Sequence, residues 1–152
     1  HVIIQAADEW IDSTIPRMDT EYSMGYQLTM ELLQEGRQFT AIAGQNDMMA
    51  IGALDALHEA KVHVPKDVSV IGCDNIFYSS IRRISLTTID HFVALKGQDA
   101  CDIILRKIDT RERALTDSAP ISLYNIEYTP KLISRRTTGY VRTRKNLSGK
   151  IN

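Results

Sequence analysis

Several features are scarce in this chain of 152 residues, and each absence excludes a class of protein. The net charge is −1, so bulk charge gives no argument for binding nucleic acid. No apolar run approaches the roughly 20 residues needed to cross a bilayer. The amino-terminal segment lacks the basic start and long apolar stretch of a secretory signal. We therefore expect a cytoplasmic protein that does not contact a membrane. Because the chain begins with His1, in a segment typical of a strand, we also expect it to start inside a longer protein.

Motifs that would indicate an enzyme or a metal site are missing as well. The chain has no GxSxG elbow, no HExxH pair and no phosphate-binding loop. Cys73 and Cys101 form no CxxC pair, and their apolar surroundings predict two buried free thiols. His58 and His63 lie five residues apart across a helix end, which is poor geometry for sharing a metal. We predict no catalytic residue, no metal and no cofactor.

Hydrophobic residues make up 43% of the chain and charged residues 24%, which is typical of a globular domain. Apolar runs alternate with amphipathic segments in the first half of the chain. Strands are expected at 2–6, 39–43 and 68–72, and helices at 20–37 and 48–60. The strand segments are apolar almost throughout, as in strands buried on both faces. This alternation predicts right-handed βαβ units. The expected fold class is therefore α/β: an open parallel sheet with helices on both faces. Thr20 or Ser23 is a candidate cap for the first helix, and Asn46 or Asp47 for the second.

The pattern is looser in the second half. We expect one or two helical turns at 77–82, a strand at 86–89, an amphipathic helix at 93–107, and two strands at 121–128 and 131–137. Between Lys131 and Lys150 the chain carries seven basic residues and no acidic one. Such a stretch can contact phosphates, or it can be a solvated, partly disordered terminus.

Two polar clusters follow strands of the predicted sheet. Gln45-Asn46-Asp47 comes after the second strand, and Asp74-Asn75 after the third. Ligands of open parallel sheets bind beyond the carboxyl ends of the strands, and carboxylates and amides suit hydroxyl-rich ligands. Asn46 and Asp47 are also ordinary helix caps, whereas Asp74 has no evident helix to cap. An acid–base pair of Asp47 and Asp74 in an enzyme is the weaker alternative, because nothing indicates an activated nucleophile.

The motifs around these clusters resemble those of the LacI/GalR family of bacterial transcription regulators. Residues 39–54 (FTAIAGQNDMMAIGAL) are similar to the family pattern PTAIxAxNDxMAxGA, and residues 64–74 (VPKDVSVIGCD) to VPxDVSVIG[FY]D. Residues 86–89 resemble the LTTI segment that comes next in the family pattern. Residues 23–26 are similar to the family's SxG[YF] at the start of a helix, and residues 131–138 to its closing strand, LIxRxST. These segments occur in the family's order and at its spacing.

The resemblance implies the carboxyl-terminal part of a periplasmic-binding-protein-like effector domain, in which two lobes hold a small effector. Residues 1–90 would form the carboxyl-terminal lobe, 91–118 a crossover and a helix of the largely absent amino-terminal lobe, 119–138 the returning strands, and 139–152 a disordered basic tail. The apolar face of the helix at 93–107 would then pack on another copy or fold back on this chain.

By the same resemblance, Asn46, Asp74 and Thr20 would contact the effector. The helix at 48–57 and the segment 76–82 would form a homodimer interface. The expected apolar contacts there are Ile51, Leu54, Phe77, Tyr78 and Ile81.

The implied function is the ligand-sensing and dimerisation region of a regulator that responds to a sugar or sugar derivative. It would meet operator DNA only through a helix-turn-helix absent from this chain. The alternative is a periplasmic sugar-binding protein of a transporter, which shares the fold.

The sequence departs from the family pattern at four places, one of which is the absence of the usual proline just before LTTI, in residues 83–85. Cys73 replaces the aromatic residue before Asp74, and Asn75 replaces a common second aspartate. Lys61 stands where relatives carry a helix-ending glycine, so a lysine is expected at positive φ, at a cost on the order of 1 kcal/mol. These departures weaken any choice among particular sugars.

Overall fold

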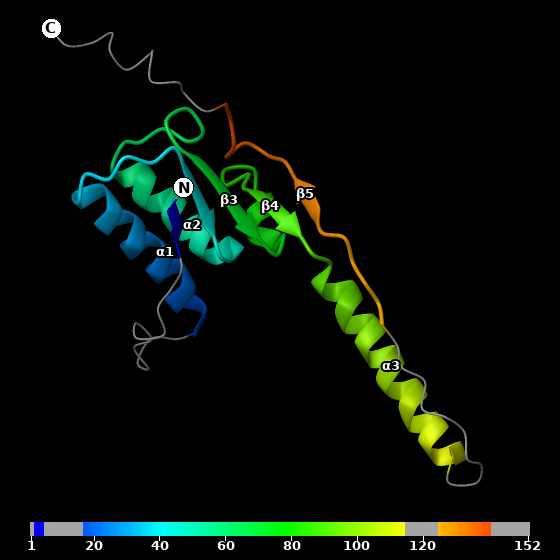
Figure 1. Cartoon of the computed structure of the whole chain (residues 1–152). Coiled ribbons are helices and arrows are strands. Elements are labelled where there is room, and N and C mark those ends of the chain that lie inside the picture. The colour runs from blue at the N-terminus through cyan, green and yellow to red at the C-terminus, as the bar shows by residue number, and fades with distance from the viewer. Residues whose placement is uncertain (1, 5–16, 115–124, 141–152) are drawn as a thin grey trace, which may run out of the picture. The chain divides into compact units, whose positions relative to one another are not determined.

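The computed structural model describes residues 2–4, 17–114 and 125–140 (Figure 1). The chain divides into two compact units. Unit 1 comprises residues 1–90 and 132–152, and unit 2 comprises residues 91–131.

The elements follow one another in the order expected for βαβ connections. They are β1 (Val2–Ile4), α1 (Arg17–Gln34), β2 (Ala41–Gly44), α2 (Asp47–Glu59), β3 (Ser69–Cys73), the 3₁₀ helix η2 (Phe77–Ser80), β4 (Thr87–Asp90), α3 (Val93–Ala114) and β5 (Lys131–Ile133). The five strands form one sheet in the order β1-β2-β3-β4-β5, and the pairs β1–β2, β2–β3 and β3–β4 are parallel. The predicted fold class, an open α/β sheet, is confirmed.

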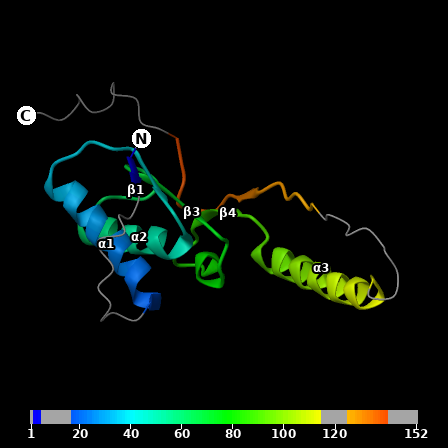
Figure 2. The ribbon, with the colours of Figure 1, turned by 60° about the horizontal axis from the view of Figure 1, so that its bottom comes forward.

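Helix α2 forms the centre of unit 1. It packs against β2 and β3 on one side and against α1 on the other, and both ribbon views show α1 and α2 side by side (Figures 1 and 2). The side chains of Ile42, Leu57 and Val70 are fully buried between α2 and the sheet. The two helices approach closely because each has a glycine at the crossing. A Cβ atom at Gly52 would lie 2.0 Å from the carbonyl oxygen of Tyr22, so no other residue fits without a backbone shift.

The segment after β5 is hydrogen-bonded into the same sheet. The backbone N–H of Val70 donates to the carbonyl of Thr137 at 2.7 Å, and the Thr137 hydroxyl donates to the carbonyl of Val70 at 2.7 Å. That hydroxyl also accepts from the backbone N–H of Thr87 at 2.8 Å. Thr137 is buried and thereby joins β3 to β4.

Unit 2 is dominated by α3. Its large apolar side chains are exposed, including Leu95, Ile104, Leu105 and Ile108. Tyr128 contacts the helix: its hydroxyl donates to the carboxylate of Asp99, and Lys96 Nζ lies 5.7 Å from the centre of its ring. The described residues of unit 2 therefore leave most of the apolar stripe of α3 uncovered.

Some expected boundaries are wrong. Helix α1 begins at Arg17, so Thr20 and Ser23 lie inside it and cannot cap it. Helix α3 continues to Ala114, beyond the expected end at residue 107, because charged residues at helical spacing extend the amphipathic pattern. Residues 125–128 form no strand, and residues 121–124 lie outside the described part of the chain. The last strand ends at Ile133, where side-chain hydrogen bonds replace a regular ladder.

The backbone of Lys61 and the exposure of the two cysteines were also predicted from the sequence. Lys61 has φ 59°, as expected for the position that follows α2. The cysteines were expected to be buried, but Cys101 is exposed and Cys73 is half-buried. Cys101 is exposed because it lies on α3, whose surface has little cover from the described residues of unit 2. Among the described residues, no helix is both long enough and apolar enough to cross a membrane.

Candidate ligand-binding rim

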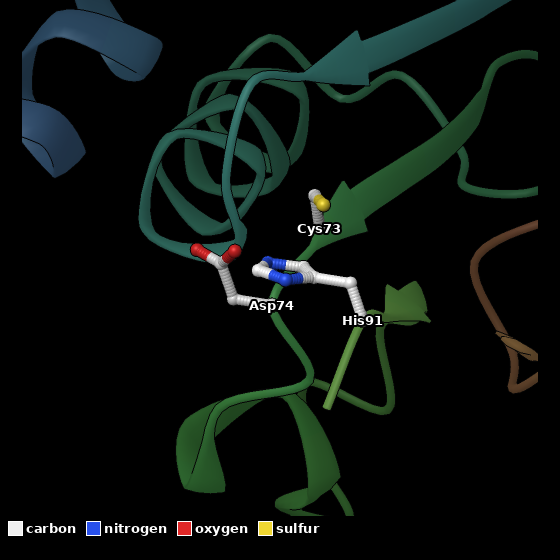
Figure 3. Close-up of side chains that lie close together, drawn as sticks. All are labelled: Cys73, Asp74 and His91. Carbon is white, nitrogen blue, oxygen red and sulfur yellow. The ribbon is translucent and has the colours of Figure 1, made fainter. Parts of the chain in front are cut away.

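The polar clusters after β2 and β3 leave the sheet at the same edge. The two strands are parallel, and Ala43 pairs with Ile71. Asn46 lies three residues after Ala43, and Asp74 lies three residues after Ile71. The two residues therefore occupy equivalent positions beyond the ends of neighbouring strands. Figure 3 shows Cys73 at the end of β3 and Asp74 just beyond it. We call the residues 45–47 and 73–76 the ligand rim.

Asn46 is the N-cap of α2. Its backbone is extended, with φ −140° and ψ 176°, and its Oδ1 accepts from the backbone N–H of Met49 at 2.9 Å. The capping interpretation of Asn46 is therefore confirmed, and that of Asp47 is wrong, because Asp47 is the first helical residue. The cap uses only Oδ1. The side-chain Nδ2 of Asn46 has no hydrogen-bond partner among the described residues, and it is the atom that could donate to a ligand.

Asp47 is a buried residue that is hydrogen-bonded to the loop after β3 and to β4. Its side chain is fully buried. Its Oδ2 accepts from the backbone N–H of Ile76 at 2.9 Å, and its Oδ1 accepts from the Thr88 hydroxyl at 2.5 Å. A Cβ atom at Gly72 would lie 2.2 Å from Oδ1, so only glycine leaves room for this carboxylate. One carboxylate thus ties the start of α2 to the loop after β3 and to β4.

The loop after β3 has a backbone conformation unusual for side-chain-bearing residues. Asp74 has φ 105° and Asn75 has φ 52°. Such conformations cost of order 1 kcal/mol or more each and persist only where the surroundings enforce them. Here three successive N–H groups are held: Asp74 donates to the carbonyl of Ile89 at 2.9 Å, Asn75 to the Thr88 hydroxyl at 3.3 Å, and Ile76 to Asp47. The direction in which the half-buried Asp74 leaves the sheet is therefore fixed.

Arg135 supports the same loop from the carboxyl-terminal segment. Its guanidinium donates to Asn75 Oδ1 at 2.7 Å, to the carbonyl of Leu86 at 2.7 Å and to the Ser79 hydroxyl at 3.1 Å. The Asn75 amide in turn donates to Asp90 at 3.0 Å. Because Arg135 is half-buried and hydrogen-bonded, it is not part of a solvated basic tail.

Burial determines the titration of two groups at the ligand rim. Burial raises the pKa of Asp47, and the nearby Asp74 adds to this, although hydrogen bonds from Thr88, Ile76 and Ser79 act in the opposite direction. Burial also raises the pKa of the Cys73 thiol, again with a contribution from Asp74. A thiol held protonated is a poor nucleophile and a poor metal ligand.

The remaining residues expected at sites lie in several places. Thr20 lies in the first turn of α1 and is half-buried. Of the five residues expected at a dimer interface, Phe77 is 77% exposed and Tyr78 and Ile81 are also exposed. Leu54 is half-buried, and Ile51 is buried in the core of unit 1. The rings of Phe77 and Tyr78 pack edge to face, 6.0 Å apart.

Sequence reasoning missed the supporting residues of the ligand rim. Asp47 was expected to cap a helix or bind ligand, and Arg135 was counted with the basic tail. No local signal indicated that Asp47 would be buried, because its burial depends on the distant residues Ile76 and Thr88. No local signal could have paired Arg135 with Asn75, which lies 60 residues away.

Comparisons with known proteins define the class. The periplasmic binding protein-like domain family matches residues 4–138. The curated relatives include the transcriptional regulator GalR of Escherichia coli, 33% identical over 119 residues, which are 78% of this chain and 32% of GalR.

Two solved structures are similar in fold. A LacI-family regulator of Enterococcus faecalis with bound ribose has a TM-score of 0.66 and 28% identity, over 80% of this chain and 42% of that one. A dimeric Lac repressor has a TM-score of 0.61 and 31% identity, over 78% of this chain and 40% of that one.

The sheet and these similarities define an α/β lobe of the periplasmic binding protein-like class. The chain belongs to the periplasmic binding protein-like domain family and corresponds to part of the effector domain of LacI/GalR-type regulators. It spans about a third of the length of the curated relatives that it matches.

Proposed function

We propose that this chain is the effector-sensing and dimerisation region of a cytoplasmic transcription regulator that responds to a sugar or sugar derivative. The observation that carries the proposal is Asp74, a half-buried carboxylate at the end of β3, level with the free amide nitrogen of Asn46. A carboxylate and an amide donor at one edge suit the hydroxyl groups of a sugar. The bound ribose of the Enterococcus faecalis regulator supports the choice of ligand class.

The proposed role of the ligand rim is binding without catalysis. The groups around Asp74 are held by internal hydrogen bonds, and the Cys73 thiol is kept protonated. An effector that contacts Asp74, Asn46 and Thr20 from one side would complete its contacts with a second lobe. Binding would then favour a closed arrangement of lobes and change the spacing of helix-turn-helix heads outside residues 1–152.

A ribose titration followed by backbone amide NMR tests the proposed site. We expect shifts confined to amides of residues 45–47 and 73–76, with an affinity weaker than about 1 μM, because half of the contacts of a two-lobed cleft are missing. Asp74→Asn is expected to abolish these shifts, and the matched control Asp102→Asn on α3 to leave them unchanged. Shifts elsewhere, or shifts that survive Asp74→Asn, would refute the site.

The proposed dimer uses the exposed residues around η2. Phe77, Tyr78 and Ile81 form an apolar surface of the kind that self-association buries, and the Lac repressor similar in fold is described as dimeric. Sedimentation velocity should show a dimer that Phe77→Asp dissociates. Leu105→Asp on α3 is the matched control, and dissociation by Leu105→Asp alone would move the interface to unit 2.

A further inference from the structure

The segment from Asp74 to Ile81 belongs to both of the proposed sites. It starts with the carboxylate of the ligand rim and continues directly into η2, where the exposed side chains of Phe77 and Tyr78 form part of the proposed dimer surface. Two residues separate Asp74 from Phe77. If so short a segment is held as one body, a change in the backbone at one end also affects the other end.

One side chain holds both parts of this segment. The guanidinium of Arg135 donates through Nη2 to Asn75 Oδ1 at 2.7 Å, and through Nη1 to the Ser79 hydroxyl at 3.1 Å. Nη1 also donates to the carbonyl of Leu86 at 2.7 Å, which attaches the same group to the residue before β4. Because a guanidinium is planar and rigid, it fixes the separation between Asn75, next to the ligand carboxylate, and Ser79, within η2.

The hydrogen bonds continue through the interior of unit 1. The Ser79 hydroxyl donates to the carbonyl of Ile76 at 2.6 Å, and the N–H of Ile76 donates to the carboxylate of Asp47 at 2.9 Å. The side chains of Ser79 and Asp47 are both fully buried, and hydrogen bonds in such surroundings are stronger than in water. An uninterrupted network therefore joins Arg135, η2 and the ligand rim.

The start of the segment has an unfavourable backbone conformation. Asp74 at φ 105° and Asn75 at φ 52° carry side chains at positive φ, a conformation that persists only where the surroundings enforce it. A ligand that binds Asp74 and a second copy that packs on Phe77 both need the same arrangement of this segment. Each therefore stabilises the arrangement that the other binds.

We infer that effector binding at the ligand rim and self-association through η2 strengthen each other, and that Arg135 mediates this coupling. The inference rests on the proposed function and adds its regulation: the effector tightens the dimer, and dimer formation tightens effector binding by the same factor. Arg135 is a positioning residue in this scheme, because it acts through Asn75 and Ser79. The expected coupling is at least about fivefold.

The first measurement of the test needs no sugar. Hydrogen exchange of peptides covering residues 73–76 is followed by mass spectrometry at chain concentrations above and below the dimer dissociation constant. Exchange in the unaltered chain is expected to be at least about fivefold slower in the dimer. Arg135→Lys keeps the positive charge but lacks the paired donors, so the difference is expected to fall below about twofold. The matched control Lys66→Gln removes an exposed cation elsewhere in unit 1 and is expected to keep the full difference.

The second measurement adds ribose. Sedimentation equilibrium gives the dimer dissociation constant with and without saturating ribose, and ribose is expected to lower it at least about fivefold in the unaltered chain and in Lys66→Gln. The effect is expected to be less than about twofold in Arg135→Lys. Ser79→Ala removes the hydrogen bond of Arg135 to η2 and leaves its bond to Asn75, so it is expected to behave like Arg135→Lys. Urea unfolding verifies that each variant folds, and Ser79→Ala, which loses one hydroxyl, provides the test if Arg135→Lys does not.

The outcomes separate this inference from the proposed function. Slower exchange in the dimer without any effect of ribose would refute ribose as the effector and would support the coupling between η2 and the ligand rim. Exchange at residues 73–76 that is independent of dimer formation would overturn the inference even where ribose binds. Equal coupling in the unaltered chain, Arg135→Lys and Ser79→Ala would also overturn it. A chain that sediments as a monomer with and without ribose would refute the proposed dimer and, with it, the inference.

Discussion

Helices α2 and α3 both carry apolar residues at helical spacing, but α2 is the more apolar of the two, and their surroundings differ greatly. Eight of the 13 residues of α2 are buried, among them Met49, Ala53 and Leu57. None of residues 93–109 of α3 is buried, and Leu105 is 64% exposed. The difference shows that the spacing of apolar residues in the sequence specifies a helix and its apolar face, whereas burial of that face also requires a second surface to pack against. In unit 1 the partners are the sheet and α1. For α3 the described residues supply little more than the contact with Tyr128.

The largest expected effect compares matched leucines on the two helices. Leu57→Ala is expected to lower the free energy of unfolding by about 2–5 kcal/mol, because Leu57 is fully buried and a cavity would remain. Leu105→Ala is expected to change it by less than about 0.5 kcal/mol. Urea unfolding followed by circular dichroism measures both. Similar losses for the two variants would mean that α3 is covered in solution.

Matched glycines give the next comparison, with effects of opposite sign. Gly52→Ala is expected to destabilise by about 3 kcal/mol, because the new methyl group meets the backbone of α1. At Gly97 on α3 a Cβ atom meets nothing within 4 Å, so Gly97→Ala is expected to raise the helix stability by about 0.5–1 kcal/mol. Thermal melts of the two variants measure these changes. A tolerated Gly52→Ala would show that α1 and α2 can separate without cost.

The smallest effect concerns two tyrosine–aspartate pairs. A hydrogen bond to Asp55 raises the pKa of Tyr22 to about 12, and a hydrogen bond to Asp99 raises the pKa of Tyr128 to about 12. A raised tyrosine pKa means that the fold prefers the neutral phenol. The contribution of Tyr22 is therefore fully present below pH 10 and is lost as pH rises towards 12.

Tyr22→Phe is accordingly expected to cost less than about 1 kcal/mol below pH 10 and to flatten the alkaline decline in stability. Tyr128→Phe is expected to leave the unfolding of unit 1 unchanged, because its partner lies on α3. Urea unfolding at pH 9 and pH 11, monitored on the methyl NMR signals of α2, distinguishes the two. An unchanged alkaline decline in Tyr22→Phe would show that the pair with Asp55 does not form in solution.

The sequence predicted the sheet because short-range patterns carry that information. Apolar strand segments and the cap at Asn46 are each determined by a few neighbouring residues, whereas the left-handed conformation of Lys61 was expected from the resemblance to the LacI/GalR family. The position of Asp74 beyond the carboxyl end of β3, on the same edge of the sheet as Asn46, followed from the topology of parallel strands. These parts of the fold and of the site needed no knowledge of distant contacts.

The rest depended on contacts between residues far apart in the chain. Asp47 is buried because Thr88 and Ile76 lie against it, and no local sequence pattern predicts this contact. The hydrogen bonds of Arg135 require that the carboxyl-terminal segment return to β3 and β4. The hollow lined by Lys61, Arg83 and Arg136 likewise assembles from segments far apart in the chain, and the sequence alone gives no sign that these cations lie together.

The placement of Thr137 between β3 and β4 has a consequence for synthesis of the protein. The N–H groups of Val70 and Thr87 acquire their acceptors only from a residue 67 and 50 positions later in the chain. While the ribosome is still making the intervening segment, the nascent lobe has a gap in its sheet. Assembly of this lobe must therefore finish after translation of the closing segment, and a chain truncated before Thr137 would leave the N–H groups of Val70 and Thr87 without these acceptors.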